Sequence, residues 1–551
     1  MVTRESVRRS VLWAAYGDVL GFITEFADKT AVRRRTGREE ITSAIPWTRR
    51  VGGRFGISIE LPAGCYSDDT QLRLATSRAI RSDGGFDVEA FAKVELPVWR
   101  SYALGGGRGT KSAARALAKA NVQWCSNFFA TKYSEYTSAG GNGAAMRIQP
   151  HVWAAPRDGD DTTVVRNIVR NAVTTHGHFR GIVGAIFHGL CLRHALLHRE
   201  APGPEEWMAI TSKLESVPSV LHSDETLGTF WIPLWEEKSG REMSKAFEEA
   251  RREVASDLLA LRNMLGVASL RNEPHELYAN AVTELGCFSK DRRGSGTKTA
   301  VLATFLAFLF SENPYACVQA AANMLGSDTD TIATMAGAIV GAASSVDVEG
   351  QVADSPYMKA EAERLYRISQ RESVPNHPYP DLLFWRSPQR ETDCVGKNSG
   401  HWVVAGLGKA VPCGQPYERK GKQRTFWQWY ELDFGQRVLM KRRDNEVAIG
   451  DSLVPAQRAE ETRSREQRTP SQGQLFGGSE TRRIQRAELQ RGTLSIDDAT
   501  DIAIKSNFDS RTVGELLVAI AKGDNGVERA TAFGAIVAKA IQARLKRGKN
   551  R

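Results

Sequence analysis

Apolar residues in the first two thirds of the chain recur at the spacing of amphipathic helices. Between Val7 and Leu20 they occupy positions 7, 11, 12, 14, 15, 19 and 20, which is the period of a helix and not the alternation of a strand. Long stretches of alternating apolar and polar residues are hard to find before residue 370. We therefore predict an all-α body over 1–370. Further helices are predicted at 70–81, 110–120, 164–175, 182–198, 243–265, 300–310, 316–325 and 331–343.

The pattern changes after residue 370. Three prolines interrupt the helical spacing, and the segments 401–408 and 424–440 are rich in tryptophan and β-branched residues, which favour strands. Residues 455–491 carry hardly any large apolar side chains, as is typical of a solvated linker. Helical spacing returns at 494–545. The predicted parts are a small basic, aromatic, β-rich module at 371–454, a flexible linker at 455–491 and a helical basic tail at 492–551.

Composition places the chain among soluble globular proteins. Of its 551 residues, 41% are hydrophobic and 25% are charged. The longest apolar run, at 300–310, is too short to cross a bilayer, which takes about 20 residues, and the N-terminus lacks the apolar stretch of a secretory signal. The 7 cysteines are scattered, with no Cys-x-x-Cys spacing. We expect a reduced, cytoplasmic chain without membrane contact and without a cysteine-based zinc site.

The net charge of +10 is concentrated in the last third. Residues 1–370 hold 43 Lys and Arg against 42 Asp and Glu, whereas 371–551 hold 31 against 22. Basic residues between 401 and 443 are interleaved with aromatic ones, a combination that can bind single-stranded nucleic acid. The same aromatic residues can instead form the core of the β-rich module. We favour this second interpretation and keep nucleic-acid contact as the alternative. We also expect the near-neutral body to fold and act without the last third.

Three acidic clusters in the predicted body require a chemical explanation. They comprise Asp18 and Glu25, then Ser67, Asp68 and Asp69, and finally Asp328, Asp330 and Thr331. Any one of these residues is well explained as a helix cap, but two adjacent acids and a second pair exceed what capping needs. Buried carboxylates this close repel one another unless cations neutralise them. Oxygen ligands with no Cys or His beside them suit Mg²⁺ or Mn²⁺ better than zinc, and the clusters could hold two ions.

Five short motifs occur in the order found in ADP-ribosylglycohydrolases. They are GDVLGFITEF (17–26), YSDDTQL (66–72), GGNGAAMRIQP (140–150), THGHFRGIVGA (175–185) and GSDTDTIATMAGAIVGA (326–342). Residues 5–345 therefore resemble this family, of the dinitrogenase reductase-activating glycohydrolase and ADP-ribosyl-acceptor hydrolase type. The C-terminal third resembles no family known to us. The resemblance implies an all-α fold, a dinuclear Mg²⁺ or Mn²⁺ centre and reversal of ADP-ribosylation.

The resemblance also implies roles for particular positions. The implied metal ligands are Ser67, Asp68, Asp69, Asp328, Asp330, Thr331 and Glu25. The implied ADP-ribose contacts are Gly141, Asn142, Gly143 and His176, together with Gly107 and Gly109 in a second glycine-rich stretch. This chain has Ser at 67 and 327, where the family often has Thr and Gly, and both substitutions preserve or tolerate ligation.

These parts predict a mechanism for cleaving the bond between ADP-ribose and an acceptor. Two ions would hold ribose hydroxyls and activate a water, and Glu25 or Asp69 would transfer the proton. Glycine backbone would approach the diphosphate closely. The alternatives are a non-catalytic ADP-ribose sensor on the same fold and an adaptor for nucleic acid or a protein partner. The sequence does not identify the acceptor, which could be a protein side chain or a nucleic acid.

Overall fold

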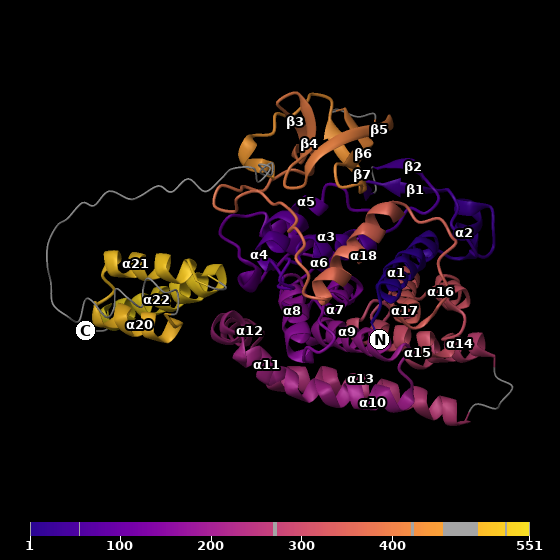
Figure 1. The fold of residues 1–551 in the computed structure, drawn as a ribbon, viewed down its shortest axis with the longest axis horizontal. Helices are drawn as coiled ribbons and strands as arrows, with labels where there is room; N and C mark the ends of the chain where they lie inside the picture. The colour runs from indigo at the N-terminus through magenta and orange to yellow at the C-terminus, as the bar shows by residue number, and fades with distance from the viewer. Residues whose placement is uncertain are drawn as a thin grey trace. The chain divides into compact units, whose positions relative to one another are not determined.

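The computed structural model describes residues 2–53, 56–267, 273–419, 424–455, 494–523 and 526–549. The chain divides into two compact units (Figure 1), one made of Met1–Val220 with Lys238–Gln457 and one made of Leu221–Glu237 with Arg458–Arg551. The linker predicted at 455–491 lies, except for Pro455, outside the described residues. The domain boundaries drawn from the sequence stay predictions.

Every helix predicted from apolar spacing is present, with ends that shift by a few residues. These helices are α1 (Arg4–Thr24), α3 (Asp68–Arg78), α6 (Arg108–Leu117), α8 (Asp161–Val173), α9 (Phe179–His198), α13 (Met243–Val267), α15 (Gly296–Leu309), α16 (Pro314–Ala322) and α17 (Thr329–Ala343). Less periodic helices accompany them: α2 (Lys29–Thr36), α4 (Val88–Ala90), α5 (Leu96–Trp99), α7 (Gln149–Trp153), α10 (Pro204–Lys213), α11 (Val217–Ser223), α12 (Ile232–Ser239), α14 (Pro274–Glu284) and α18 (Ser355–Ser369). The prediction of a helical body is confirmed.

Helices α1 and α17 pack with their backbones in contact. A Cβ atom on Gly17 would lie 2.3 Å from the Ala333 carbonyl oxygen, and one on Gly21 would lie 2.4 Å from the Asp330 Cα. Only glycine permits this approach. The chain direction is opposite in the two helices, since later residues of α1 meet earlier residues of α17. The end of α1 therefore meets the start of α17, which brings the first and last motifs together.

Helix α9 is an apolar centre of the body. It is long and apolar enough to cross a membrane, but 83% of its most apolar window is buried inside the protein, as in a core helix. A Cβ on Gly184 would lie 2.2 Å from the Gly296 carbonyl oxygen, so α9 and α15 also approach closely. This contact places the loop before α15 beside the loop before α9.

The body also contains a β-hairpin that the sequence analysis missed. Strands β1 (Trp47–Val51) and β2 (Ile57–Leu61) pair antiparallel, with Trp47 opposite Leu61. Each strand has 5 residues, which is too short for alternation to be recognised. The hairpin matters because it carries Arg49 into the site described below.

The predicted β-rich module is a five-stranded antiparallel meander in the order β3-β4-β5-β6-β7 (Figure 1). Its strands are β3 (Val395–Asn398), β4 (His401–Val404), β5 (Gly408–Arg419), β6 (Thr425–Leu432) and β7 (Arg437–Arg443). The segment predicted at 424–440 divides into two strands at a turn in which Gly435 has a φ of 96°. The module belongs to the same compact unit as the helical body.

The smaller unit is helical, as predicted for the tail. Its helices are α20 (Ile496–Lys505), α21 (Ser510–Ala521) and α22 (Gly526–Lys549). Ala499, Leu516 and Phe533 are buried in its apolar core. Arg529 of α22 forms an ion pair of 3.1 Å with Glu225 and so ties in the segment Leu221–Glu237.

Candidate active site

The predicted acidic residues lie at the ends of three helices. Glu25 follows the last residue of α1, Asp68 and Asp69 open α3, and Asp330 lies in the first turn of α17. The antiparallel packing of α1 on α17 brings two of these ends together. Glu25, Asp68, Asp69 and Asp330 are buried, with at most 9% of any residue exposed, and Asp328 is half-buried.

One cleft of about 570 Å³ collects nearly every residue predicted for the site. Its lining includes Glu25, Asp68, Asp69, Gly107, Gly109, Gly141, Asn142, Gly143, His176, Asp328, Asp330 and Thr331. Ser67 is the exception, because it does not line the cleft. Its hydroxyl oxygen instead accepts a hydrogen bond of 3.1 Å from the Asp69 N–H and caps α3.

Asp18 anchors the loop that carries the first acidic pair. One of its carboxylate oxygens accepts from the Ser67 N–H at 3.0 Å, and the other accepts from the Thr70 N–H at 2.9 Å. Asp18 lies in α1 and is fully buried. Its carboxylate faces backbone N–H donors at the start of α3. Asp18 belongs to the first acidic cluster of the sequence, where its spacing alone indicates no role.

Glu25 is held by a cation that the sequence analysis missed. The Arg49 guanidinium donates to Glu25 Oε2 at 3.1 Å and lies over the Phe22 ring, 4.2 Å from its centroid. Burial raises the pKa of Glu25, and Arg49 opposes that rise. A carboxyl group with a raised pKa, held at the edge of a cleft, is suited to proton transfer.

Asn142 links the glycine-rich loop to the second acidic pair. Its side-chain amide donates to Asp328 Oδ2 at 2.9 Å and to the Thr299 hydroxyl at 3.2 Å. Asp330 Oδ1 accepts from the Thr331 N–H at 2.9 Å. Asp69 Oδ2, in contrast, is buried without a hydrogen-bond partner.

The carboxylates of the cleft destabilise one another's charged forms. Burial and then the neighbouring Glu25 raise the pKa of Asp68 to about 7. Burial and other carboxylates raise the pKa of Asp69 and of Asp330 well above the usual range. Such a cluster is what divalent cations neutralise, and its oxygen donors fit Mg²⁺ or Mn²⁺. No group of three Asp, Glu, His or Cys side chains among the described residues forms an assembled ion site, so the ligand set stays a prediction.

Glycine backbone also lines the cleft. A Cβ on Gly143 would lie 2.8 Å from the Thr110 hydroxyl and 3.1 Å from the His176 ring. Gly107 caps the N-terminus of α6, and the residues around it expose backbone N–H groups. Lys290 and Arg293, which the sequence analysis did not single out, also line the cleft. Glycine backbone with these two cations nearby is suited to an anion such as a diphosphate.

His176 is a neutral imidazole in this setting. It is 3% exposed, one ring nitrogen lies 2.7 Å from the Thr175 hydroxyl, and burial lowers its pKa to about 3. It therefore contributes a hydrogen-bonding ring and not a charge.

Comparison with known proteins identifies the family of the helical body. A model of the ADP-ribosylglycohydrolase family matches residues 1–347. ADP-ribosylhydrolase ARH3 of Bos taurus is 28% identical over 60% of this chain and 82% of the bovine protein. ADP-ribosylhydrolase ARH3 of Homo sapiens is 26% identical over 65% of this chain and 92% of the human protein. A solved structure titled "ADP-ribosylglycohydrolase-related protein complex" matches with 19% sequence identity and a TM-score of 0.40. The match covers 66% of this chain and 98% of the chain in that structure.

Proposed function

Because the chain belongs to the ADP-ribosylglycohydrolase family, and is therefore a glycosyl hydrolase, we propose that it releases ADP-ribose from a modified acceptor with the help of two Mg²⁺ or Mn²⁺ ions. The observation that carries this proposal is the buried carboxylate cluster beside a glycine-lined cleft. In that cluster, Asp69 Oδ2 has no hydrogen-bond partner and burial with mutual repulsion raises the pKa of Asp68 and Asp330.

The proposed ligands are the oxygen donors at the starts of α3 and α17. They are Ser67, Asp68, Asp69, Asp328, Asp330 and Thr331, with Glu25 at the edge. Ser67 keeps a second lone pair while it caps α3. When bound, the ions would supply positive charge that balances the carboxylates, orients ribose hydroxyls and polarises water.

The residues of the chain divide the remaining tasks. Glu25, with Asp69 as the second candidate, would take a proton from the attacking water and return one to the leaving acceptor. Backbone N–H groups near Gly107 and Gly141 would bind the diphosphate, with Lys290 and Arg293 as countercharges. The neutral ring of His176 would contact the bound nucleotide from the wall of the cleft.

Acceptor, partners and compartment belong to the proposal as well. We propose a cytoplasmic enzyme that acts on an ADP-ribosylated protein side chain, with a nucleic-acid acceptor as the alternative. Cations of the β-rich module already lie over its own aromatic rings, as Arg442 does over Trp402 and Phe426. This observation favours the structural interpretation of those aromatics over single-strand binding. A non-catalytic sensor would not need both Glu25 and the carboxylate cluster.

The test is release of ADP-ribose from arginine, serine and nucleic-acid conjugates by the purified full-length chain. We expect hydrolysis of at least one conjugate with Mg²⁺ or Mn²⁺, loss of activity after chelation and recovery when the ion is returned. Full activity after exhaustive chelation would refute the metal-dependent mechanism. Tight binding of ADP-ribose without turnover of any conjugate would support the sensor.

A further inference from the structure

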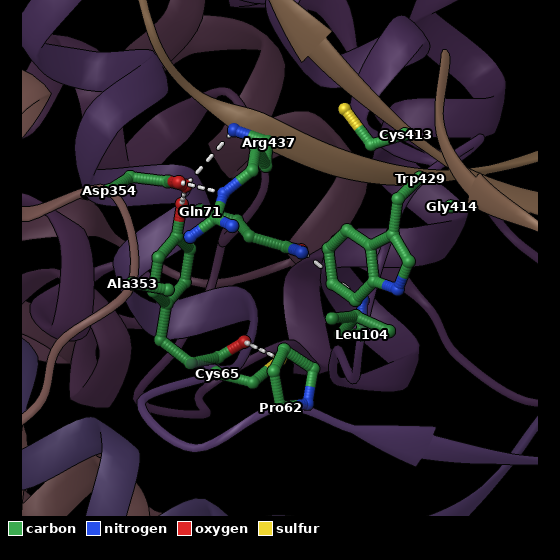
Figure 2. Close-up of a pocket in the computed structure, with 11 residues that line it drawn as sticks. Pro62, Cys65, Gln71, Leu104, Ala353, Asp354, Cys413, Gly414, Trp429 and Arg437 are labelled. Atoms are coloured by element: carbon green, nitrogen blue, oxygen red, sulfur yellow. Dashed lines mark hydrogen bonds and ion pairs between the residues drawn. The ribbon is translucent and has the colours of Figure 1, made fainter.

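A polar network joins the β-rich module to the loop of the first acidic pair. Tyr66, immediately before Ser67, donates its hydroxyl hydrogen to Asp354 Oδ2 at 2.7 Å. Arg437 of β7 donates its backbone N–H to the same oxygen at 3.0 Å and its side-chain Nε–H to Asp354 Oδ1 at 2.9 Å. Gln436 donates to the Tyr66 hydroxyl oxygen at 3.4 Å. Asp354 is thus shared between the site loop and the module (Figure 2).

The backbone at Asp354 is in an unfavourable conformation. Its φ of 57° lies in the left-handed region, which is unfavourable for a residue with a side chain. Its carboxylate is 2% exposed. The preceding residue, Ala353, donates its N–H to the Gly64 carbonyl at 2.9 Å. The segment before α18 is therefore fixed against the loop that leads into the acidic pair.

The same turn of the module also reaches the other end of α3. Gln436 Oε1 accepts from Arg78 at 2.7 Å. Arg78 in turn donates two hydrogen bonds, of 2.7 and 2.8 Å, to Glu95, and neither side chain of that pair is exposed. Helix α3, whose first turn carries Asp68 and Asp69, is thus tied to one β-turn at its start and at its end.

The module also lies against the hairpin that carries Arg49. A Cβ on Gly52, where φ is 89°, would lie 3.3 Å from the Trp427 ring of β6. The module therefore contacts the supports of both Asp68 and Glu25.

The seam between module and body is incompletely filled beside the site loop. A cavity of about 170 Å³ remains between Pro62 and Leu104 on the body and Trp429 on the module (Figure 2). Asp354 and Arg437 line the same cavity. The hydrogen bonds of Tyr66, Asp354 and Arg437 cross the seam beside this cavity, while Phe434 of the same turn packs on Tyr357 of α18 with 5.2 Å between ring centroids.

We propose that the β-rich module is a positioning element of the active site, in which Arg437 and Gln436 hold the Ser67–Asp69 loop through Asp354 and Tyr66. The proposal rests on the proposed function for its metal and activity consequences. It replaces the expectation that the body acts alone, because removing residues beyond 370 also removes two of the three groups that donate to Asp354.

The test compares Arg437→Ala with Arg443→Ala in the full-length chain. Arg443 lies on the same strand, but it pairs with Asp393 at 2.6 Å and donates to the Thr392 hydroxyl at 3.2 Å, away from the site loop. Tyr66→Phe is the second variant, because it removes the donor to Asp354 while keeping the buried ring. The first measurement is hydrogen–deuterium exchange of the backbone over residues 62–72 in chelator, a readout that needs neither metal nor substrate.

We expect several-fold faster exchange over 62–72 in Arg437→Ala and Tyr66→Phe, and wild-type exchange in Arg443→Ala. The affinity for Mg²⁺ or Mn²⁺, measured by calorimetry, should fall about tenfold, the lower end of the effect of residues that orient metal ligands. Arg437→Lys should restore part of the lost metal affinity. Unchanged exchange and unchanged affinity in both test variants would overturn the proposal. If the wild type binds no metal, the proposed function fails. The exchange data still test whether the module positions the site loop.

Discussion

Replacing Asp18 by Asn tests how the site loop is held. The carboxylate accepts two backbone hydrogen bonds, from Ser67 at 3.0 Å and from Thr70 at 2.9 Å. Asn has the same shape but only one acceptor oxygen, so its NH₂ group would face the second buried N–H donor. That donor would lose its partner, and the loop would have to move.

The expected magnitude follows from the loss of one buried, charge-assisted hydrogen bond. Leaving a buried donor unsatisfied costs about 1–3 kcal/mol, so the larger unit should unfold at lower denaturant concentration. The loop also carries Asp68 and Asp69, and a misplaced support for metal ligands typically lowers affinity about 10–100-fold. Removing the Asp18 charge weakens the attraction for a cation as well, so both effects lower metal affinity.

The assay is denaturant unfolding in chelator together with calorimetric titration of Mg²⁺ and Mn²⁺. Asp28→Asn is the matched control: Asp28 caps the exposed helix α2 through a hydrogen bond of 2.7 Å from the Ala31 N–H. Asn and Asp cap helices about equally well, so this control should change stability by only a few tenths of a kcal/mol. Wild-type metal affinity in Asp18→Asn would refute the inference that Asp18 sets the geometry of the loop.

Two further predictions concern the carboxyl groups of the cleft. Glu25→Gln should bind ADP-ribose as the wild type does but turn over about 10²–10⁴ times more slowly, because a proton-transfer group is lost; wild-type turnover would make Glu25 a structural partner of Arg49. For Asp68, burial and Glu25 raise the pKa to about 7 in the folded state, so its proton stabilises the metal-free fold at low pH and this contribution is lost as pH rises from about 4 towards 7. In chelator, the melting temperature of Asp68→Asn minus that of the wild type should therefore be higher at pH 8 than at pH 5. An equal difference at both pH values would contradict the raised pKa.

The sequence predicted what depends on neighbours along the chain. The helices follow from apolar spacing within each segment, and the acidic motifs lie at helix starts, where local signals are strong. In the structure, Glu25, Asp69 and Asp330 meet in one cleft because α1 and α17 are antiparallel. Glycines within the motifs, such as Gly21, make that packing possible.

The sequence could not predict what depends on distant partners. Arg49 lies on a strand of 5 residues whose buried positions are only Trp47 and Val51, so neither the hairpin nor its cation was expected. Asp18 has no local signature, because its hydrogen-bond partners are 49 and 52 residues away. The contact of Arg437 with Asp354 spans 83 residues, so the module was expected to be separable. Arg293 could have been noticed as a cation beside a glycine loop.

Helix capping, the simplest explanation of the acidic motifs, fails once the hydrogen bonds are assigned. The start of α3 is already capped by the Ser67 hydroxyl and the Asp18 carboxylate, so Asp68 and Asp69 are surplus to it. Asp328 precedes α17 without a capping hydrogen bond from its side chain. Elsewhere in the body, the buried Glu95 is paired with the Arg78 guanidinium. In the cleft, burial and neighbouring carboxylates dominate the environment of Asp69 and Asp330. Burying like charges together is strongly unfavourable without countercharge, and the cations proposed above would supply it.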